Sequence, residues 1–391
     1  MKIGSWARLL LAAAPLLAGC ANFWQAPSST TTITTTPSTL SSGIFYVANQ
    51  ETMQIVAYDI VSGKLNQINA YPLSAAPYAI AIAPNSSFLY VSTPVGIYLY
   101  TIGSGGVLTV GNGGGVISTD VTSTLQVDPS AKWLVDALQG TSGVQLNAIP
   151  ITSTGAYSGG TVSTVSYSIS NAAVHQLAIS PDNNNVFVAL GAGGTLVVPF
   201  TYSNSNPFGS GATTIQVAHS GGSALAVAVD PSNRLFYIGE TLANSSSNSG
   251  GLRAFNYSSL GSATLTQASG SPLASGGLAP NSILPLASGD YVYVANGAGT
   301  GASGNVAEFG ITSTGSSTAT TYTVTAGSTI AAGIQPSGLA EDNLGNFVLA
   351  VSSGGSYDLE AYTMSAGTLT AALTSTTGTD PVQAVAVAAL P

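Results

Sequence analysis

Cysteine and charged residues are scarce in this sequence, and their scarcity excludes several classes of function. Cys20 is the only cysteine, so no disulfide can form within the chain, and metal–thiolate and cysteine-nucleophile chemistry are excluded. Charged residues make up 5% of the chain, with 6 basic and 15 acidic residues and a formal net charge of −9. Nucleic acid is therefore not an expected partner, because its phosphates are bound by clustered lysine and arginine.

Histidine is almost as rare. His175 and His219 are the only imidazoles available as bases near neutral pH, and the sequence has no HExxH motif and no Cys/His cluster. The glycine-rich runs at 113–115 and 191–194 do not open a helix after a strand, so we interpret them as turns and not as phosphate-binding loops. We expect neither a metal nor a cofactor.

Glycine and proline, by contrast, are abundant, with 46 and 19 residues. Such a composition could indicate disorder, but 45% of the residues are hydrophobic and the mean hydropathy is +0.37. The chain therefore carries enough apolar surface to bury a core.

One short pattern recurs seven times, an apolar strand followed by a turn and a second strand that carries aromatic residues. The seven pairs are 45–49 with 55–58, 89–92 with 96–100, 133–137 with 144–149, 186–190 with 195–200, 235–239 with 252–257, 291–296 with 306–311, and 347–352 with 359–364. A unit repeated at about 50 residues is typical of a β-propeller, which has one four-stranded blade per repeat. The fold class is therefore predicted to be all-β.

A second pattern, of alternating small and branched residues, precedes most hairpins and often ends in proline, as in 78–84 and 175–181. It suits the innermost strand of a blade, where neighbouring blades crowd together and large side chains do not fit. The segment 381–389 has this pattern but no hairpin after it, and the hairpin at Phe45 has no such strand before it. We therefore predict that residues 44–73 and 381–389 complete one blade and close a ring of seven blades.

The beginning of the chain has the pattern of an export signal. Lys2 and Arg8 precede an apolar run that is too short to span a bilayer. Residues 1–19 are therefore predicted to be a cleaved signal peptide. Residues 20–42 are rich in serine, threonine and proline, and they are predicted to form a flexible tether. Residues 43–391 are predicted to be the propeller.

The run Leu-Ala-Gly-Cys at 17–20 resembles the bacterial lipoprotein box. The resemblance implies that Cys20 is lipidated and becomes the first mature residue. Ala21 follows it in place of aspartate, which in such lipoproteins implies release to the outer membrane. We expect an exported outer-membrane lipoprotein, facing the periplasm or the cell surface, that contacts the membrane only through its lipid.

Polar residues from separate repeats are predicted to share one face of the propeller. His175 begins an inner strand, and His219 lies in the loop before the next one. Glu240 ends the second strand of that next blade, and Glu51 takes the corresponding place in the first blade. In an antiparallel blade, the start of the inner strand and the end of the second strand lie at the same end of the sheet.

An imidazole and a carboxylate at that end could act as general base and acid on a small molecule. His175 and Glu240 are therefore candidate catalytic residues, and His219 and Glu51 are candidate binding residues. The alternative is that all are ordinary polar loop residues. That interpretation is favoured for His219, and both remain open for His175.

Asp136 is a further candidate catalytic residue. It occupies the position of Val91, Val188 and Ile238 in other repeats, and is therefore predicted to lie between blades. A buried carboxylate must be paired, hydrogen-bonded or protonated. A structural role is favoured, and a role in the site is the alternative.

The repeated phrases resemble the lactonase-type propellers, which include 6-phosphogluconolactonase and carboxymuconate cyclase, and the related YVTN-repeat proteins. The resemblance rests on the Pro-Asp/Asn/Ser turns and the Tyr-Val-Ala-Asn strands, and it covers about residues 44–390. His175, six residues before Pro181, looks like the family's histidine before an equivalent turn. The resemblance implies a seven-bladed fold with a central pocket.

The sequence departs from that family where its enzymes carry charge. The Arg-His pair expected at the next inner strand is replaced by Leu225 and Ala226, and Gly297 follows Asn296 where arginine is usual. Glu240 stands one residue early relative to the family's glutamate. No arginine remains at these positions to hold a phosphate or carboxylate.

We therefore expect a lipid-anchored, lactonase-like propeller of the cell envelope that binds a small neutral carbohydrate, a lactone or an envelope protein through a degenerate catalytic site. The alternative is a hydrolase of sugar lactones, a lactonase-type carboxylic ester hydrolase that uses His175 as base and Glu240 or Asp136 as partner. A purely architectural role is the third hypothesis.

Overall fold

The computed structural model describes residues 43–61, 64–152, 155–245, 249–261, 265–298, 302–316, 319–355, 358–371 and 383–390. The chain divides into two compact units, 1–39 and 40–391, and only the second contains described residues. The predicted signal peptide, the tether and Cys20 lie outside the described residues. Within them, no helix has the length and hydrophobicity needed to cross a bilayer.

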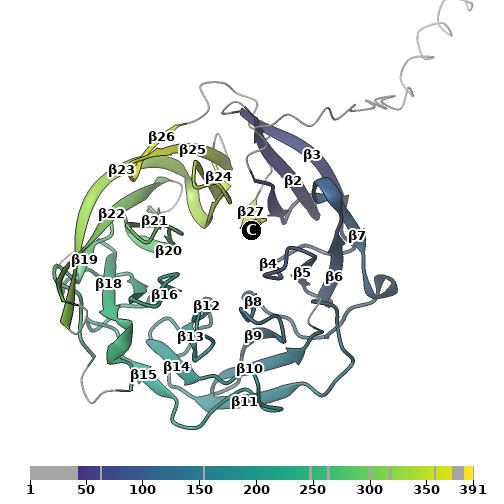
Figure 1. The fold of residues 1–391 in the computed structure, drawn as a ribbon, viewed down its shortest axis with the longest axis horizontal. Coiled ribbons are helices and arrows are strands. Elements are labelled where there is room, and N and C mark those ends of the chain that lie inside the picture. The colour runs from purple at the N-terminus through teal and green to yellow at the C-terminus, as the bar shows by residue number, and fades with distance from the viewer. Residues whose placement is uncertain are drawn as a thin grey trace, which may run out of the picture. The chain divides into compact units, whose positions relative to one another are not determined.

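The second unit is an all-β propeller, in which strands form sheets arranged around a central axis (Figure 1). Five sheets have four strands each. They are β27 (Ala384–Ala389), β1 (Phe45–Asn49), β2 (Gln54–Val61) and β3 (Lys64–Pro72); β4 (Ala79–Ile82), β5 (Phe88–Thr93), β6 (Gly96–Ile102) and β7 (Leu108–Val110); β8 (Leu125–Val127), β9 (Trp133–Gln139), β10 (Gly143–Pro150) and β11 (Ser163–Ser168); β12 (Gln176–Ile179), β13 (Asn185–Ala189), β14 (Thr195–Pro199) and β15 (Thr213–Ile215); and β16 (Ala224–Val229), β17 (Leu235–Glu240), β18 (Gly251–Asn256) and β19 (Leu273–Ala274).

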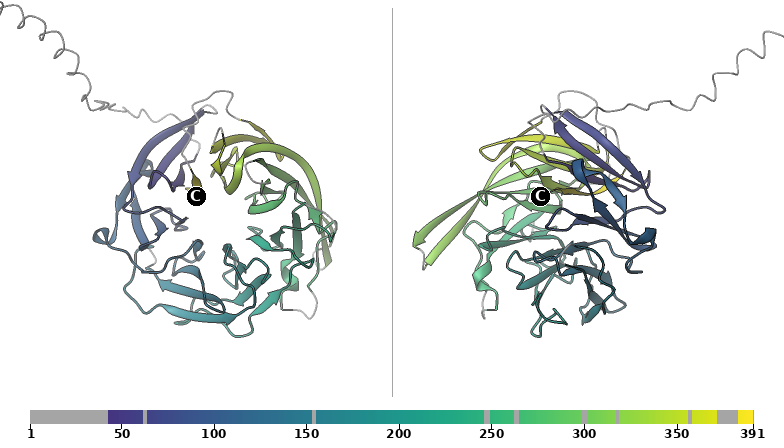
Figure 2. Two further views of the ribbon diagram at one scale, coloured as in Figure 1. Left: turned by 180° about the vertical axis from the view of Figure 1, so that it is seen from behind. Right: turned by 45° about the vertical axis from the view of Figure 1, so that its right-hand side comes forward.

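The remaining strands form one seven-stranded sheet. They are β20 (Ala279–Pro285), β21 (Tyr291–Gly297), β22 (Ser303–Ser316), β23 (Ala319–Glu341), β24 (Phe347–Gly354), β25 (Leu359–Ser365) and β26 (Thr368–Ala371). Strands β22 and β23 pair along most of their length and project beyond the ring in the turned view (Figure 2). The only helical elements described are the short 3-10 turns η1 (Ser104–Gly106), η2 (Asn112–Gly114) and η3 (Tyr257–Ser259).

The prediction of seven separate blades is wrong, because the structure has five four-stranded blades and one seven-stranded sheet. The seven repeated hairpins are all paired as predicted, but the last two belong to the same sheet. Strand β23 pairs with β22 as far as Ile334 and with β24 from Ile334 onward. Gln335 adopts a left-handed φ of 52°, and the register shifts just after it, so the strand changes partners without a loop between the two repeats.

The sheets pack face to face, which explains why the middle strands are buried on both sides. Tyr46, Tyr90 and Tyr293 are 0% exposed and therefore need a partner for each hydroxyl. The Tyr46 hydroxyl donates to the Gly106 carbonyl at 2.8 Å, that of Tyr293 donates to Gly367 at 2.6 Å, and that of Tyr90 donates to Gly155. All three acceptor glycines have positive φ and lie in turns. In each case the glycine belongs to the repeat that follows the repeat of its tyrosine.

Side chains also connect the innermost strands of neighbouring repeats. The Gln126 amide oxygen accepts the Ile179 N–H at 2.8 Å, and the Gln176 amide oxygen accepts the Val227 N–H at 3.0 Å. Thr124, Asn281 and Ser337 make similar bonds to the backbone of the following inner strand. These bonds provide partners for backbone groups on inner-strand edges that no neighbouring strand pairs.

The ring closes through the end of the chain, as predicted. Strand β27 pairs antiparallel with β1, from Phe45 opposite Ala389 to Asn49 opposite Ala384. Ser337 on β23 donates its hydroxyl to the Ala384 carbonyl at 2.9 Å, so β27 is also bound to the inner strand on its other side.

We predict that a chain ending at residue 381 loses its cooperative thermal transition, because β1 and the inner edge of β23 would both lose a partner. Circular dichroism on heating measures this, with a chain lacking only residue 391 as control. A truncated chain with the transition of the full chain would contradict closure through β27.

Candidate functional site

A small pocket of about 210 Å³ lies where the inner strands converge on the axis. Strands β4, β8, β12, β20, β23 and β27 all contribute to it. Its polar lining residues are Tyr78, Ser123, Thr124, His175, Gln176, Asn281, Ser282 and Ser337. None of the described lining residues is Asp, Glu, Lys or Arg, so the pocket offers hydrogen bonds without formal charge.

His175 is the one sequence-predicted residue that lines this pocket. It stands immediately before β12, and its backbone N–H donates to the Ala189 carbonyl at 3.0 Å. Its ring lies against Gly191, where an added Cβ would come within 3.3 Å of Nε2. His175 is an exposed residue, but desolvation of its ring by the surrounding protein lowers its pKa from 6.5, so the imidazole is mainly neutral at pH 7 and can either accept or donate a hydrogen bond.

Several other polar groups of the pocket already have structural partners. The Thr124 hydroxyl accepts the Leu177 N–H at 2.8 Å, and the Asn281 amide donates to the Pro336 carbonyl at 3.0 Å. For Ser123 and Ser282, no side-chain hydrogen bond is found within the described part of the chain. The pocket therefore combines fixed polar groups with hydroxyls that can turn toward a ligand.

Glu240 does not line the pocket but forms a buried ion pair elsewhere. It is 2% exposed and pairs with Arg253, whose Nη1 lies 2.6 Å from Oε1. Its Oε2 accepts the Ala218 N–H at 2.9 Å, and Arg253 also donates to the Gln216 carbonyl at 2.9 Å. The pair binds the loop before β16 to the neighbouring strands, and removing either partner would leave a buried charge alone.

The two other candidate binding residues also stand apart from the pocket lining. The imidazole of His219 is half-buried, and Nε2 lies 3.2 Å from the Ala243 carbonyl. Glu51 is exposed in the turn between β1 and β2. The structure therefore brings none of Glu240, His219 and Glu51 into the pocket with His175.

Asp136 lies within β9, opposite Leu125 on β8 and Asn147 on β10. It is 0% exposed, and neither carboxyl oxygen meets hydrogen-bond geometry with a described group, although the side chains of Asp120 and Asn147 lie near enough to affect its pKa. Burial raises the Asp136 pKa well above its ordinary value, and the negative charge of Asp120 raises it further. Burial therefore favours the protonated form of the side chain, which lies away from the residues that line the pocket.

Sequence reasoning missed most of the pocket, although a positional signal was present. Tyr78, Ser123 and His175 each stand six residues before the proline that ends the inner-strand pattern, at Pro84, Pro129 and Pro181. Aligning the repeats on that proline would have identified all three. No group of three or more His, Cys, Asp or Glu residues suited to a metal is found among the described residues.

Comparison with known proteins identifies the fold. No family model and no curated protein matches the sequence. A proposed 6-phosphogluconolactonase from Bacteroides uniformis is 16% identical with a TM-score of 0.65, covering 89% of this chain and 99% of its own. A Lactobacillus plantarum protein is 15% identical with a TM-score of 0.61, covering 90% and 100%. Hydrazine synthase of Kuenenia stuttgartiensis is 15% identical with a TM-score of 0.56, covering 86% and 99%.

These likenesses define a β-propeller that includes lactonase-like structures among its neighbours. At such low identities they show the fold alone, because one propeller architecture supports many unrelated functions.

Asp136 generates a prediction about pH. Its pKa is raised in the folded state, so the folded protein holds this proton more tightly than the unfolded chain does. The stability that this contributes is fully present below the ordinary carboxyl pKa near 3.8, and it is lost as the pH rises through the folded-state pKa. We predict that Asp136→Asn increases the free energy of unfolding above pH 7 by about 1–3 kcal/mol, because it removes the cost of a buried group that can ionise.

Denaturant unfolding at pH 4 and pH 8 measures this effect, and the two proteins should converge at pH 4. Asp59→Asn, at a half-buried position on β2, is the matched control. A loss of stability in Asp136→Asn at pH 8 would contradict a cost of ionising the buried carboxyl.

Proposed function

We propose that the protein is a lipid-anchored propeller of the cell envelope whose central pocket binds a small neutral carbohydrate or lactone without converting it. The observation that carries this proposal is the uncharged polar lining of the pocket around His175. Hydroxyl, amide and imidazole groups match the hydroxyls and carbonyl of a sugar lactone. None of the described lining residues is a cation that could hold a phosphorylated sugar.

The absence of a carboxylate from the described lining favours binding over hydrolysis. General-base catalysis by His175 would profit from an acid that orients the ring, as in other imidazole-based sites. Glu240 is engaged by Arg253, and Asp136 is buried in β9. His175 therefore serves best as a hydrogen-bonding residue.

A second candidate function is hydrolysis of neutral sugar lactones. The specific observation that favours it is the lowered pKa of His175, since a neutral imidazole at pH 7 can accept a proton from water. Likeness to a proposed 6-phosphogluconolactonase is consistent with this alternative but gives only the fold.

We predict that the purified full-length protein binds neutral sugars or their lactones and does not hydrolyse them. His175→Ala should weaken binding about tenfold, equivalent to about 1.4 kcal/mol for a lost hydrogen bond. Calorimetry on a panel of neutral and phosphorylated lactones measures binding, and product assays on the same samples measure turnover.

His219→Ala, which removes an imidazole outside the pocket lining, is the control and should bind like the unaltered protein. Turnover that requires His175 would establish the hydrolase instead. If neither binding nor turnover is detected for any member of the panel, the proposal of a sugar or lactone site is wrong.

The lipid anchor is tested separately. We predict that the protein labels with radioactive palmitate in cells and fractionates with the outer membrane, because Cys20 follows a sequence that resembles the lipoprotein box. Cys20→Ser should abolish both labelling and membrane fractionation. A Cys20→Ser protein that still fractionates with the membrane would show that something other than acylation holds it there.

A further inference from the structure

The central pocket has two chemically different walls. Strand β27 contributes Val385 and Val387, while Tyr78 and Ile80 come from β4 and the residue just before it. Strands β27 and β4 are neighbours around the axis (Figure 1), and Ile80 and Val385 belong to one hydrophobic cluster. Farther round the axis, β8, β12 and β20 contribute polar residues, among them Gln176. One wall is therefore apolar and aromatic, and the other offers hydrogen bonds.

A repeated irregularity of the inner strands brings side chains from both walls to the pocket. In four of these strands the pairing register skips one residue, which is Leu225, Asn281, Ser337 or Val385. Just before β4 and β12, Tyr78 and His175 each donate their N–H to the carbonyl of the residue that pairs with the next position, Ser92 at 2.9 Å and Ala189 at 3.0 Å.

All of these extra residues except Leu225 line the pocket. A β-bulge disturbs the ladder and re-aims a side chain, and such bulges are over-represented next to binding and active sites. The lining is thus built by a departure from regular pairing that recurs from repeat to repeat. A purely architectural ring would not need this departure at the same place in so many strands.

The polar wall keeps some of its groups available to a ligand. The side chains of Thr124 and Gln176 are occupied, because each accepts a backbone N–H of the following inner strand. Within the described part of the chain, no side-chain hydrogen bond is found for Ser123, His175 or Ser282, all of which line the pocket. The available donors and acceptors therefore come from β8, β12 and β20 and not from the apolar wall.

The volume of the pocket limits what it can enclose. It is about 210 Å³. An apolar cavity of about 150 Å³ holds one benzene molecule. The pocket can therefore enclose one six-membered ring with its substituents.

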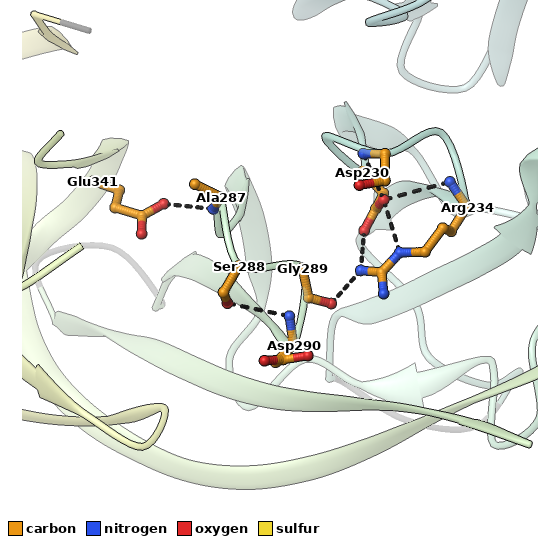
Figure 3. A network of polar contacts seen from close by, with 8 residues as sticks. Asp230, Arg234, Ala287, Ser288, Gly289, Asp290 and Glu341 are labelled. Atoms are coloured by element: carbon orange, nitrogen blue, oxygen red, sulfur yellow. Dashed lines mark hydrogen bonds and ion pairs between the residues drawn. The ribbon is translucent and has the colours of Figure 1, made fainter. Parts of the chain in front are cut away.

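A second cavity, of about 570 Å³, lies at the other end of the inner strands, between the turns after β20 and β23. Glu341, which lines it, already accepts the Ala287 N–H at 2.7 Å (Figure 3). Beside it, Asp342 Oδ1 accepts the N–H groups of Asn346 and Phe347, each at 2.7 Å. These acids connect the turns of the chain, and the second cavity serves below as the control site.

We propose that the central pocket binds one neutral pyranose ring, with the C–H face of the sugar against Tyr78 and the apolar wall. The inference rests on the proposed function, a pocket for a small neutral carbohydrate, and adds which part of the sugar meets each wall. The axial C–H groups of a pyranose form an apolar face, and burying that face against an aromatic ring removes apolar area from water.

The hydroxyls of the same sugar project around its rim and would bind Ser123, His175 and Ser282 on the polar wall. Neutral hydroxyl and imidazole groups can both donate and accept, so they match sugar hydroxyls without burying a charge. Tyr78 is therefore assigned as the residue that distinguishes a ring from an open chain. Its own hydroxyl has no hydrogen bond among the described residues, so the aromatic face is its contribution.

Calorimetry on the full chain tests the ligand class. D-glucose, D-galactose and D-mannose are each compared with their open-chain alditol, which keeps the hydroxyls but lacks the flat C–H face. We expect at least one of the sugars to bind about tenfold or more tightly than its alditol. Equal affinities of each sugar and its alditol would overturn the inference and leave the proposed function standing.

Binding of none of the three sugars would also overturn the inference. The proposed function fails with it only if the panel of neutral lactones does not bind either.

Variants test the residue. Tyr78→Ala should weaken the sugar about tenfold or more, whereas Tyr78→Phe, which keeps the aromatic face, should stay within about threefold of the unaltered protein. Tyr98→Ala removes another half-buried tyrosine, on β6 and outside the pocket lining, and Glu341→Gln alters the second cavity. Neither control should change the affinity. A control that loses as much affinity as Tyr78→Ala would overturn the location.

Saturation-transfer NMR on the unaltered protein keeps the inference testable if Tyr78→Ala does not fold. The C–H protons of one face of the bound sugar should receive the strongest saturation, because they lie against the protein. Equal saturation of both faces would overturn the stacked orientation.

Discussion

The unpaired edge of each innermost strand is the constraint on which the propeller depends. Strands crowded around an axis cannot all pair with one another, yet their backbone groups are too enclosed to rely on water. Side chains of the preceding repeat supply many of the missing bonds, with Gln126 to Ile179 and Gln176 to Val227 as two examples. Polar residues near the axis are thus structural before they are functional.

This constraint also shapes the pocket. Threonine, glutamine, asparagine and serine can accept or donate without ionising, so they connect the strands at little desolvation cost, whereas a carboxylate there would need a cation. The pocket therefore inherits a lining that is polar and uncharged. His175, which stands immediately before β12, joins Ser123 and Ser282 as a lining residue whose side chain makes no bond to the next strand among the described residues and can serve a ligand.

Much of the architecture could be predicted from the sequence, because the hairpins and their alternating burial are local patterns. Closure by β27 followed from an inner strand without a hairpin at the end of the chain and a hairpin without an inner strand near its start. The number of separate blades did not, since the continuity of β23 depends on Gln335 adopting a left-handed conformation that no local pattern indicates. Glutamine rarely adopts such a conformation, and tertiary contacts decided it.

The candidate site was predicted less well than the fold. His175 could be placed because topology fixes the end of the sheet at which an inner strand begins. Glu240 and Arg253 lie on adjacent strands, opposite Gly251 and Ile238. Their pairing required knowing the register of β17 and β18. Asp136 was predicted to be buried, but its lack of partners depends on how the neighbouring sheet packs. Side-chain partnerships across repeats are invisible in a single sequence without the register.

The continuity of β23 has a mechanical consequence. Elsewhere in the ring, adjacent sheets are joined by loops, so one sheet can unfold without the next. The two repeats from β20 to β26 share strand β23 and are expected to unfold together. Ser337 and Glu341 are four residues apart on that strand, a rise of about 13 Å. Strain applied at one end of this stretch is therefore carried to the other through a single extended chain.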